Sequence, residues 1–172
     1  MQDTMLSVAF WEGHVVQSCR EQADGSLLIE LGEDSKREAI CGACGDPCAL
    51  VHERSWREVR ERDWLDRRVW LRVPVRRMDC LHCGARAVER IGWLNRHARL
   101  TERLRAWVEV LTELLPIAHV AKLTGLPWHT VKEIDQTRLQ RKFGPFEGRG
   151  GACAGWSWTN LPCTRVIVTR PS

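Results

Sequence analysis

The sequence predicts an α+β fold in which a β-rich, metal-binding half precedes a helical half. Two C-x-x-C motifs, at 41–44 and 80–83, have the spacing of a structural zinc site. Between them, residues 69–78 (VWLRVPVRRM) alternate in a way that is typical of a strand. After Thr101, apolar residues recur every three or four positions, which indicates helices. We therefore expect a β-hairpin and a zinc ribbon, then a three-helix helix-turn-helix domain and an irregular C-terminal tail.

The four cysteines of the two motifs are the expected ligands of one Zn²⁺ ion. A glycine follows each motif and lets the backbone turn back past the ion, and two such turns complete the tetrahedral sulfur site that zinc prefers. Cys48 and His52 remain open as substitute ligands, although the spacing of Cys48 is less suitable. The alternative is a set of buried or redox-active cysteines. The expected ligands are Cys41, Cys44, Cys80 and Cys83.

The strand patterns place the domain boundaries. In residues 69–78, Val69, Leu71, Val73 and Val75 share one face, and residues 49–60 show a weaker strand pattern. An Asp-Gly turn between two apolar runs indicates a hairpin before the ribbon. The expected units are a hairpin packing on the ribbon (1–40), the zinc ribbon (41–91), the helix-turn-helix (92–146) and the tail (147–172).

Charge is distributed unevenly along the chain. Residues 1–35 have a net charge of −6 and the rest of the chain has a net charge of +10. Most of the basic residues after residue 35 are arginines, whose guanidinium group binds phosphate through two parallel hydrogen bonds. The positive body suggests nucleic acid as the partner, and the alternative is a solvated surface of mixed charge. The sequence has no long apolar run and no apolar leader, so we expect a cytoplasmic protein without a membrane partner.

The helical half has the pattern of a helix-turn-helix. Thr101 is the expected N-cap of a helix that ends before Pro116. In the next segment, a small residue, Ala121, falls where two helices would cross, and Gly125 can adopt the positive φ of a tight turn. Val131 and Ile134 would face the first helix of the motif. The alternative is a pair of ordinary packed helices.

The second helix of this motif would begin near Pro127, and its N-terminal end would enter the major groove of double-stranded DNA. The candidate DNA contacts are the exposed residues at this end of the helix, together with two further basic residues of the motif. Trp128 is equally plausible as a packing residue, and the lysines and arginine are typical phosphate contacts. The candidates are Lys122, Trp128, His129, Thr130, Lys132 and Arg138.

Residues 14–146 resemble the insertion-sequence transposases of the ISL-three type. The resemblance rests on CGACG, RRVWLRVPVRRMDCLHCG, ERIGWL and LPIAHVAKLTGLPWHTVKEIDQTRL. It implies a zinc ribbon and a helix-turn-helix that bind the terminal inverted repeats of a transposable element. It also implies a catalytic domain of the RNase H-like type, with three carboxylates and divalent metal, that performs DNA recombination.

The chain departs from this family after about Phe143. Residues 144–172 contain one acid, Glu147, so no carboxylate triad can be formed there. In the shifted reading frame the codons of Trp158-Thr159 specify an aspartate, which indicates a frameshift near residues 147–151. We therefore expect a truncated transposase that is not an enzyme, with a second copy of itself or an intact transposase as further candidate partners. The alternative is a complete zinc-ribbon and helix-turn-helix transcriptional regulator or antitoxin-like repressor.

Overall fold

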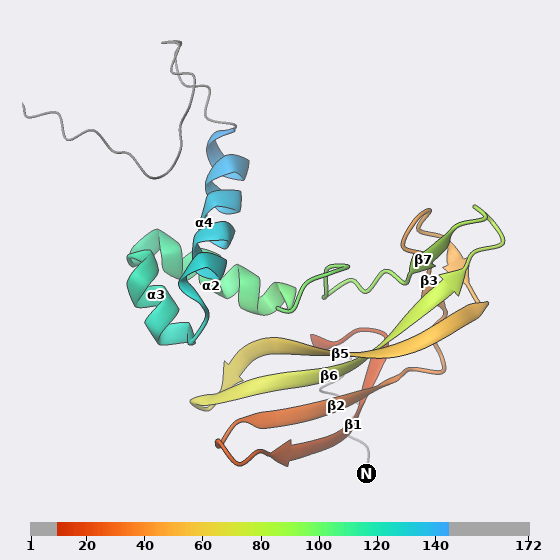
Figure 1. The fold of residues 1–172 in the computed structure, drawn as a ribbon, viewed down its shortest axis with the longest axis horizontal. Helices are drawn as coiled ribbons and strands as arrows, with labels where there is room; N and C mark the ends of the chain where they lie inside the picture. The colour runs from red at the N-terminus through yellow and green to blue at the C-terminus, as the bar shows by residue number, and fades with distance from the viewer. Residues whose placement is uncertain (1–9, 145–172) are drawn as a thin grey trace, which may run out of the picture.

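A computed structural model describes residues 10–144, which form a β-sheet half and a three-helix half (Figure 1). The expected α+β class is confirmed. The tail expected at 147–172, with its proposed frameshift, lies outside the described residues. The strands are β1 (His14–Glu21), β2 (Leu27–Glu33), β3 (Ala39–Ile40), β4 (Pro47–Cys48), β5 (Val51–Trp64), β6 (Arg67–Asp79) and β7 (Arg86–Val88). The helices are α2 (Glu102–Leu114), α3 (Ile117–Thr124) and α4 (Trp128–Phe143).

The main sheet has the strand order β1-β2-β6-β5, with β7 also paired to β6. The β1–β2 and β5–β6 pairs are antiparallel hairpins, whereas β2 pairs with β6 in parallel, from Leu27 opposite Val69 to Glu30 opposite Arg72. The hairpin that we expected to pack on the ribbon therefore extends the ribbon's sheet edge to edge. Segments before and after residue 40 thus share one sheet, because β2 and β6 satisfy each other's backbone hydrogen-bonding groups.

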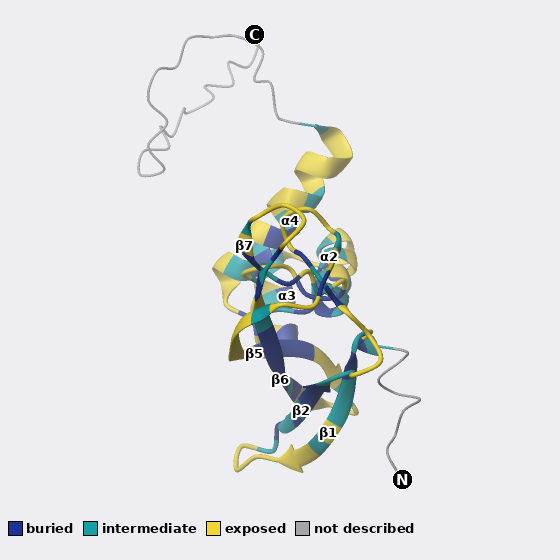
Figure 2. Ribbon diagram, turned by 90° about the vertical axis from the view of Figure 1, so that its right-hand side faces the viewer, coloured by how far each residue is buried: buried dark blue, intermediate teal, exposed yellow. Residues whose placement is uncertain are grey.

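One face of β6 forms the core of the sheet half. Val69, Leu71, Val73 and Val75 are at most 3% exposed, as the alternating pattern predicts. Their cover comes from segments outside the sheet, namely Trp11, Trp93 and Leu94. Figure 2 shows that burial is concentrated in β2 and β6, whereas α4 becomes exposed toward its C-terminal end.

The three helices pack around a second apolar cluster. Thr101 is the N-cap of α2, and its side chain accepts a hydrogen bond from the Leu104 N–H. The helix ends at Leu114, before Pro116, and Leu115 follows it as an exposed C-cap. None of the helices in residues 10–144 is long and apolar enough to cross a membrane. The cluster consists of Leu104, Val108, Leu111, Val120, Leu126, Val131 and Ile134.

The edge strand β5 joins the two halves. The Arg60 N–H donates to the Arg99 carbonyl at 2.8 Å, and the Thr101 N–H donates to the Arg60 carbonyl at 3.1 Å. Glu61, which is completely buried, accepts hydrogen bonds from Trp11 Nε1 (3.0 Å), Thr101 Oγ1 (3.0 Å) and the Arg62 N–H (2.7 Å). One carboxylate therefore connects the N-terminal segment, the sheet and the first turn of α2.

His14, at the start of β1, predicts a loss of stability in mild acid. The residue is 5% exposed, and the centre of its ring lies 5.2 Å from the centre of the Trp93 ring. Burial lowers the pKa of His14, so the unfolded chain takes up a proton first as the pH falls through about 6.5. The free energy of unfolding should fall there by at most about 1.4 kcal/mol per pH unit.

Denaturation of the parent and of His14→Phe at several pH values measures this contribution. The phenylalanine retains an aromatic ring against Trp93 but cannot titrate, and protonation of other groups affects both proteins equally. We expect the stability difference between them to change between about pH 7 and pH 5. A difference that is constant over this range would contradict the prediction.

Candidate metal centre and nucleic-acid interface

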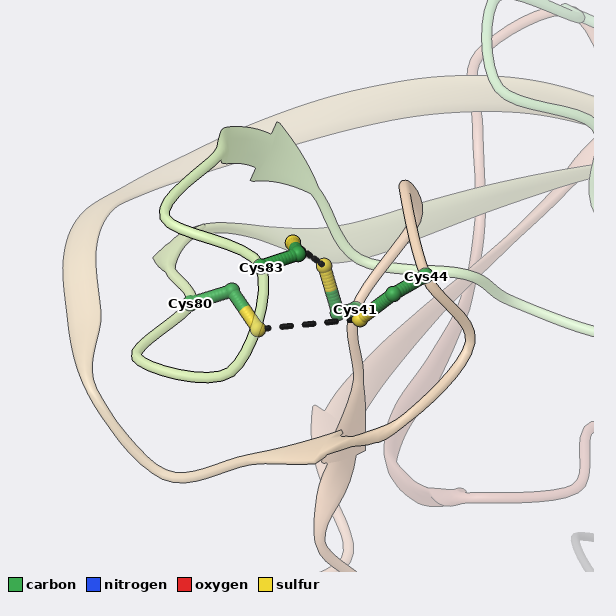
Figure 3. Close-up of side chains that lie close together, drawn as sticks. All are labelled: Cys41, Cys44, Cys80 and Cys83. Atoms are coloured by element: carbon green, nitrogen blue, oxygen red, sulfur yellow. Dashed lines mark hydrogen bonds between the residues drawn. The ribbon is translucent and has the colours of Figure 1, made fainter.

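Four cysteine sulfurs meet at one end of the ribbon (Figure 3). All four lie within 4.8 Å of one another, with Cys41 Sγ 3.9 Å from Cys83 Sγ and Cys44 Sγ 3.7 Å from Cys80 Sγ. A tetrahedral zinc site with Zn–S bonds of about 2.3 Å requires sulfurs about 3.8 Å apart. The spacing between the thiols therefore suits a four-sulfur metal site.

The two C-x-x-C turns, which we call the knuckles, have the same backbone structure. In the first knuckle the Gly45 N–H donates to the Cys41 carbonyl at 3.0 Å, and in the second the Gly84 N–H donates to the Cys80 carbonyl at 2.8 Å. Both glycines have positive φ, +84° for Gly45 and +69° for Gly84, a backbone conformation that residues with a side chain rarely adopt. The sequence thus aims two pairs of sulfurs at the same point.

Backbone N–H groups stabilise the thiolates of Cys41 and Cys80, the first cysteine of each knuckle. The pKa of Cys80 falls to about 6, chiefly because the Cys83 N–H points at its sulfur, and partly because the His82 N–H also does. The pKa of Cys41 is lowered in the same way by the N–H groups of Cys44 and Ala43. Metals bind the thiolate form, so this arrangement favours an ion at the sulfurs.

The two possible substitute ligands lie outside the four-sulfur cluster. Cys48 is buried, its thiol donates to the Asp79 carbonyl at 3.5 Å, and burial raises its pKa. His52 Nδ1 lies 3.3 Å from the Asp79 carboxylate. Both therefore support the strand that leads into Cys80 without belonging to the cluster.

The first knuckle packs tightly against β7 at Gly42. A Cβ atom added at this position would lie 2.0 Å from the Val88 carbonyl oxygen, which is backbone and cannot move away cheaply. We expect Gly42→Ala to lower the free energy of unfolding by about 1–3 kcal/mol. The control is Gly92→Ala, where nothing lies within 4 Å of an added Cβ. Thermal or chemical unfolding measures both, and equal effects would show that the knuckle can shift freely.

The α3–α4 segment consists of two helices joined by a tight turn at Gly125. Gly125 adopts φ +66°, and the buried Thr124 hydroxyl donates to the Val120 carbonyl at 2.8 Å and accepts from the Leu126 N–H at 3.4 Å. Val131 and Ile134 are buried against the other helices. The motif therefore presents the N-terminal end of α4 on the outside.

The candidate DNA contacts fall into two groups. Lys122, Trp128 and His129 are exposed, Thr130 is half-buried beside them, and Lys132 Nζ lies 5.2 Å from the centre of the Trp128 ring. Arg138 differs, because its side chain is 13% exposed and forms ion pairs with Asp135 at 2.7 Å and Glu113 at 2.9 Å. Asp135 raises its pKa. Arg138 thus ties α4 to α2, and its contact with a phosphate stays a prediction.

A cleft of about 940 Å³ separates the sheet from α4. Arg68, Trp70 and Arg99 line it on one side, and Thr130, Gln136 and Thr137 line it on the other. Nothing in the sequence indicates that Arg99 lies opposite α4, although it belongs to a connector rich in basic residues. No signal along the chain could have identified the cleft, because its walls come from segments far apart in sequence.

The fold and the four-sulfur cluster define a zinc-ribbon and helix-turn-helix protein. Residues 37–83 match the zinc-finger of transposase IS204/IS1001/IS1096/IS1165, and residues 81–139 match the helix-turn-helix domain of transposase family ISL3. The chain belongs to the ISL3 family of insertion-sequence transposases, to whose zinc-ribbon and helix-turn-helix part these residues correspond. The alternative of a stand-alone regulator is not favoured by these matches.

One curated relative is similar to most of the chain. The transposase for insertion sequence element IS1001 from Bordetella parapertussis is 36% identical over 137 residues, which cover 79% of this chain and 34% of the relative. The chain thus spans about a third of the length of that relative. No solved structure is significantly similar to the chain.

Proposed function

We propose that this chain binds duplex DNA sequence-selectively at the terminal inverted repeats of its insertion sequence. In this proposal α4 enters the major groove, and Zn²⁺ on Cys41, Cys44, Cys80 and Cys83 holds the ribbon together. The observation that carries the proposal is the exposed N-terminal end of α4, presented by a buried three-helix core. Such an end suits the groove because its side chains reach base edges without moving the helix.

The proposed contacts have different roles. His129 and Thr130 are suited to hydrogen bonds with base edges, and Lys122 and Lys132 supply positive charge for phosphates or guanine. Trp128 is half-exposed and flanks Lys132, so it can support the lysine or pack against a deoxyribose. Base contacts would set the preferred sequence, and phosphate contacts would set the salt dependence of affinity.

Selection from a random-core duplex library, followed by binding assays, tests the proposal. We expect Thr130→Ala and Lys132→Ala to weaken binding to the selected duplex about tenfold, because each lost base contact costs roughly 1–3 kcal/mol. Lys142→Ala is the matched control, since it removes the same charge from the other end of α4, where Lys142 lies 3.5 Å from Glu113. If the parent selects no sequence, the proposal fails. If both groups of variants bind alike, α4 is not the recognition helix.

We further propose that these 172 residues bind DNA without cutting it. Two-metal strand transfer needs several carboxylates on rigid strands, and residues 144–172 contain Glu147 alone. Occupation of the element's ends, alone or with a second copy, would then inhibit an intact transposase. Cleavage of a terminal-repeat duplex in Mg²⁺ or Mn²⁺ by the purified chain would contradict this proposal. The nucleotide sequence after the Phe143 codon, translated in the other frame, tests the frameshift.

A further inference from the structure

In the part of the chain that the structure describes, Arg57 of β5 has no carboxylate partner. Within residues 10–144, several other arginines of β5 and β6 are paired: Arg54 with Glu33, Arg60 with Asp63, Arg72 with Glu30, and Arg76 with Glu89. The Arg57 side chain forms no ion pair or hydrogen bond with any described residue, although it is half-buried. Partial burial of an unpaired charge costs free energy, so this guanidinium is available to an anion.

The charged group that acts on the Arg57 guanidinium is another arginine, Arg99. Burial lowers the pKa of Arg57, and the positive charge of Arg99 lowers it further. Arg99 itself forms no side-chain ion pair within the described residues, and its backbone is fixed beside β5 by the Arg60–Arg99 hydrogen bond. Two like charges held together without an acid raise the free energy of the folded chain. A bound anion would remove that cost.

The connector that carries Arg99, residues 90–101, is itself basic. It contains Arg90, Arg96, His97 and Arg99 and no aspartate or glutamate. The cleft beside it is different, because Glu58, Glu102 and Glu133 line its walls. A polyanion should therefore lie on the rim formed by the connector rather than enter the cleft.

The position of this rim relates it to α4. Arg99 lines one wall of the cleft, and Thr130, Gln136 and Thr137 of α4 line the opposite wall. A duplex seated on the exposed face of α4 would pass close to that rim. Arg99 and the proposed recognition helix thus face one another across a single cleft, and Arg57 lies on the strand beside Arg99.

We propose that Arg57 and Arg99 bind a backbone phosphate of the same duplex that α4 contacts, so that the zinc-ribbon half and the helix-turn-helix grip one DNA molecule together. This inference rests on the proposed function. A phosphate between two guanidinium groups would accept charge-assisted hydrogen bonds from both, and it would carry no sequence information of its own.

The test compares Arg57→Gln, Arg99→Gln and the double variant with the parent, on the selected duplex and on a scrambled duplex. We expect the double variant to bind both duplexes about tenfold more weakly, and the slope of log affinity against log salt to become shallower by about 1 for each arginine that contacts a phosphate. Arg20→Gln is the control, because Arg20 is an exposed arginine on β1, at the opposite edge of the sheet from β5. It should leave affinity and slope unchanged.

Unfolding midpoints separate a ligand-binding role from a structural one. Removal of one charge from a repelling pair should leave the midpoint of Arg57→Gln unchanged or raise it, while DNA binding weakens. If the parent binds DNA but the double variant has the same affinity and salt slope, this inference is wrong while the proposed function stands. A lowered midpoint that accounts for the binding loss would also overturn it. If the parent binds no duplex, the proposed function itself fails.

Discussion

Replacement of Cys80 with serine, or removal of metal by a chelator, is expected to unfold the knuckle end of the ribbon. The apolar cluster there is small and consists of Ala39, Cys41, Cys48, Met78, Cys80 and Ala87. Structural zinc supplies roughly 10–16 kcal/mol in zinc-finger peptides, which exceeds the total stability of many domains. Even a fraction of that contribution would outweigh the burial of so few side chains.

Elemental analysis and amide hydrogen exchange measure this effect. We expect one zinc per chain, and loss of protection at the Gly45 and Gly84 amides when the metal is removed. Cys19→Ser is the control, because Cys19 is an exposed thiol on β1 outside the cluster. Cys48→Ser should also retain one zinc, since its sulfur lies outside the cluster. A ribbon that stays protected in chelator would show that zinc does not hold it together.

Replacement of Glu61 with alanine should cost about 3–5 kcal/mol of unfolding free energy. The change would leave two buried donors, from Trp11 and Thr101, and one partly buried donor, the Arg62 N–H, without their acceptor. Because Thr101 caps α2, its loss of a partner should also loosen the first turn of that helix. Denaturant unfolding measures the loss, and exchange of the Leu104 amide reports the cap.

Two further variants make the Glu61 prediction specific. Glu61→Gln keeps the volume and one acceptor oxygen but introduces an amide NH₂ group among donors, so we expect an intermediate loss. Glu58→Ala, three residues earlier on β5, removes an exposed carboxylate on the other side of the strand and should change stability little. Equal effects at positions 58 and 61 would contradict a special role for the buried carboxylate.

Features that depend on local spacing could be predicted from the sequence. The cysteine cluster follows from two C-x-x-C motifs, the buried face of β6 from its alternation, and the turn between α3 and α4 from Gly125. Each depends on residues only a few positions apart. The strength of such signals comes from backbone geometry that a short segment determines by itself.

Other features could not be predicted because they depend on distant segments. The parallel pairing of β2 with β6 has no connecting turn, so no local signal marks it. The β5–β6 turn uses Leu65 and Asp66 at φ 47° and 65°, without the glycine that usually identifies a hairpin. The end of β5 therefore could not be located from the sequence, and the strand continues past the expected residue 60 to Trp64. In the sequence, Glu61 and Arg138 have the pattern of ordinary surface charges, and only the fold places Glu61 in the interior and covers most of Arg138.

The parallel pairing also has a kinetic consequence for the chain as it leaves the ribosome. Both β2 and β5 are synthesised before β6, which lies between them in the sheet. Until Asp79 has emerged, neither strand is paired with β6, so the nascent chain exposes an unpaired edge on β2 and another on β5 during this interval. Formation of the sheet therefore waits for a contact of high sequence separation, which is typical of slow folding. Synonymous codons that slow translation just before β6 would lengthen the interval in which those edges can pair with another chain.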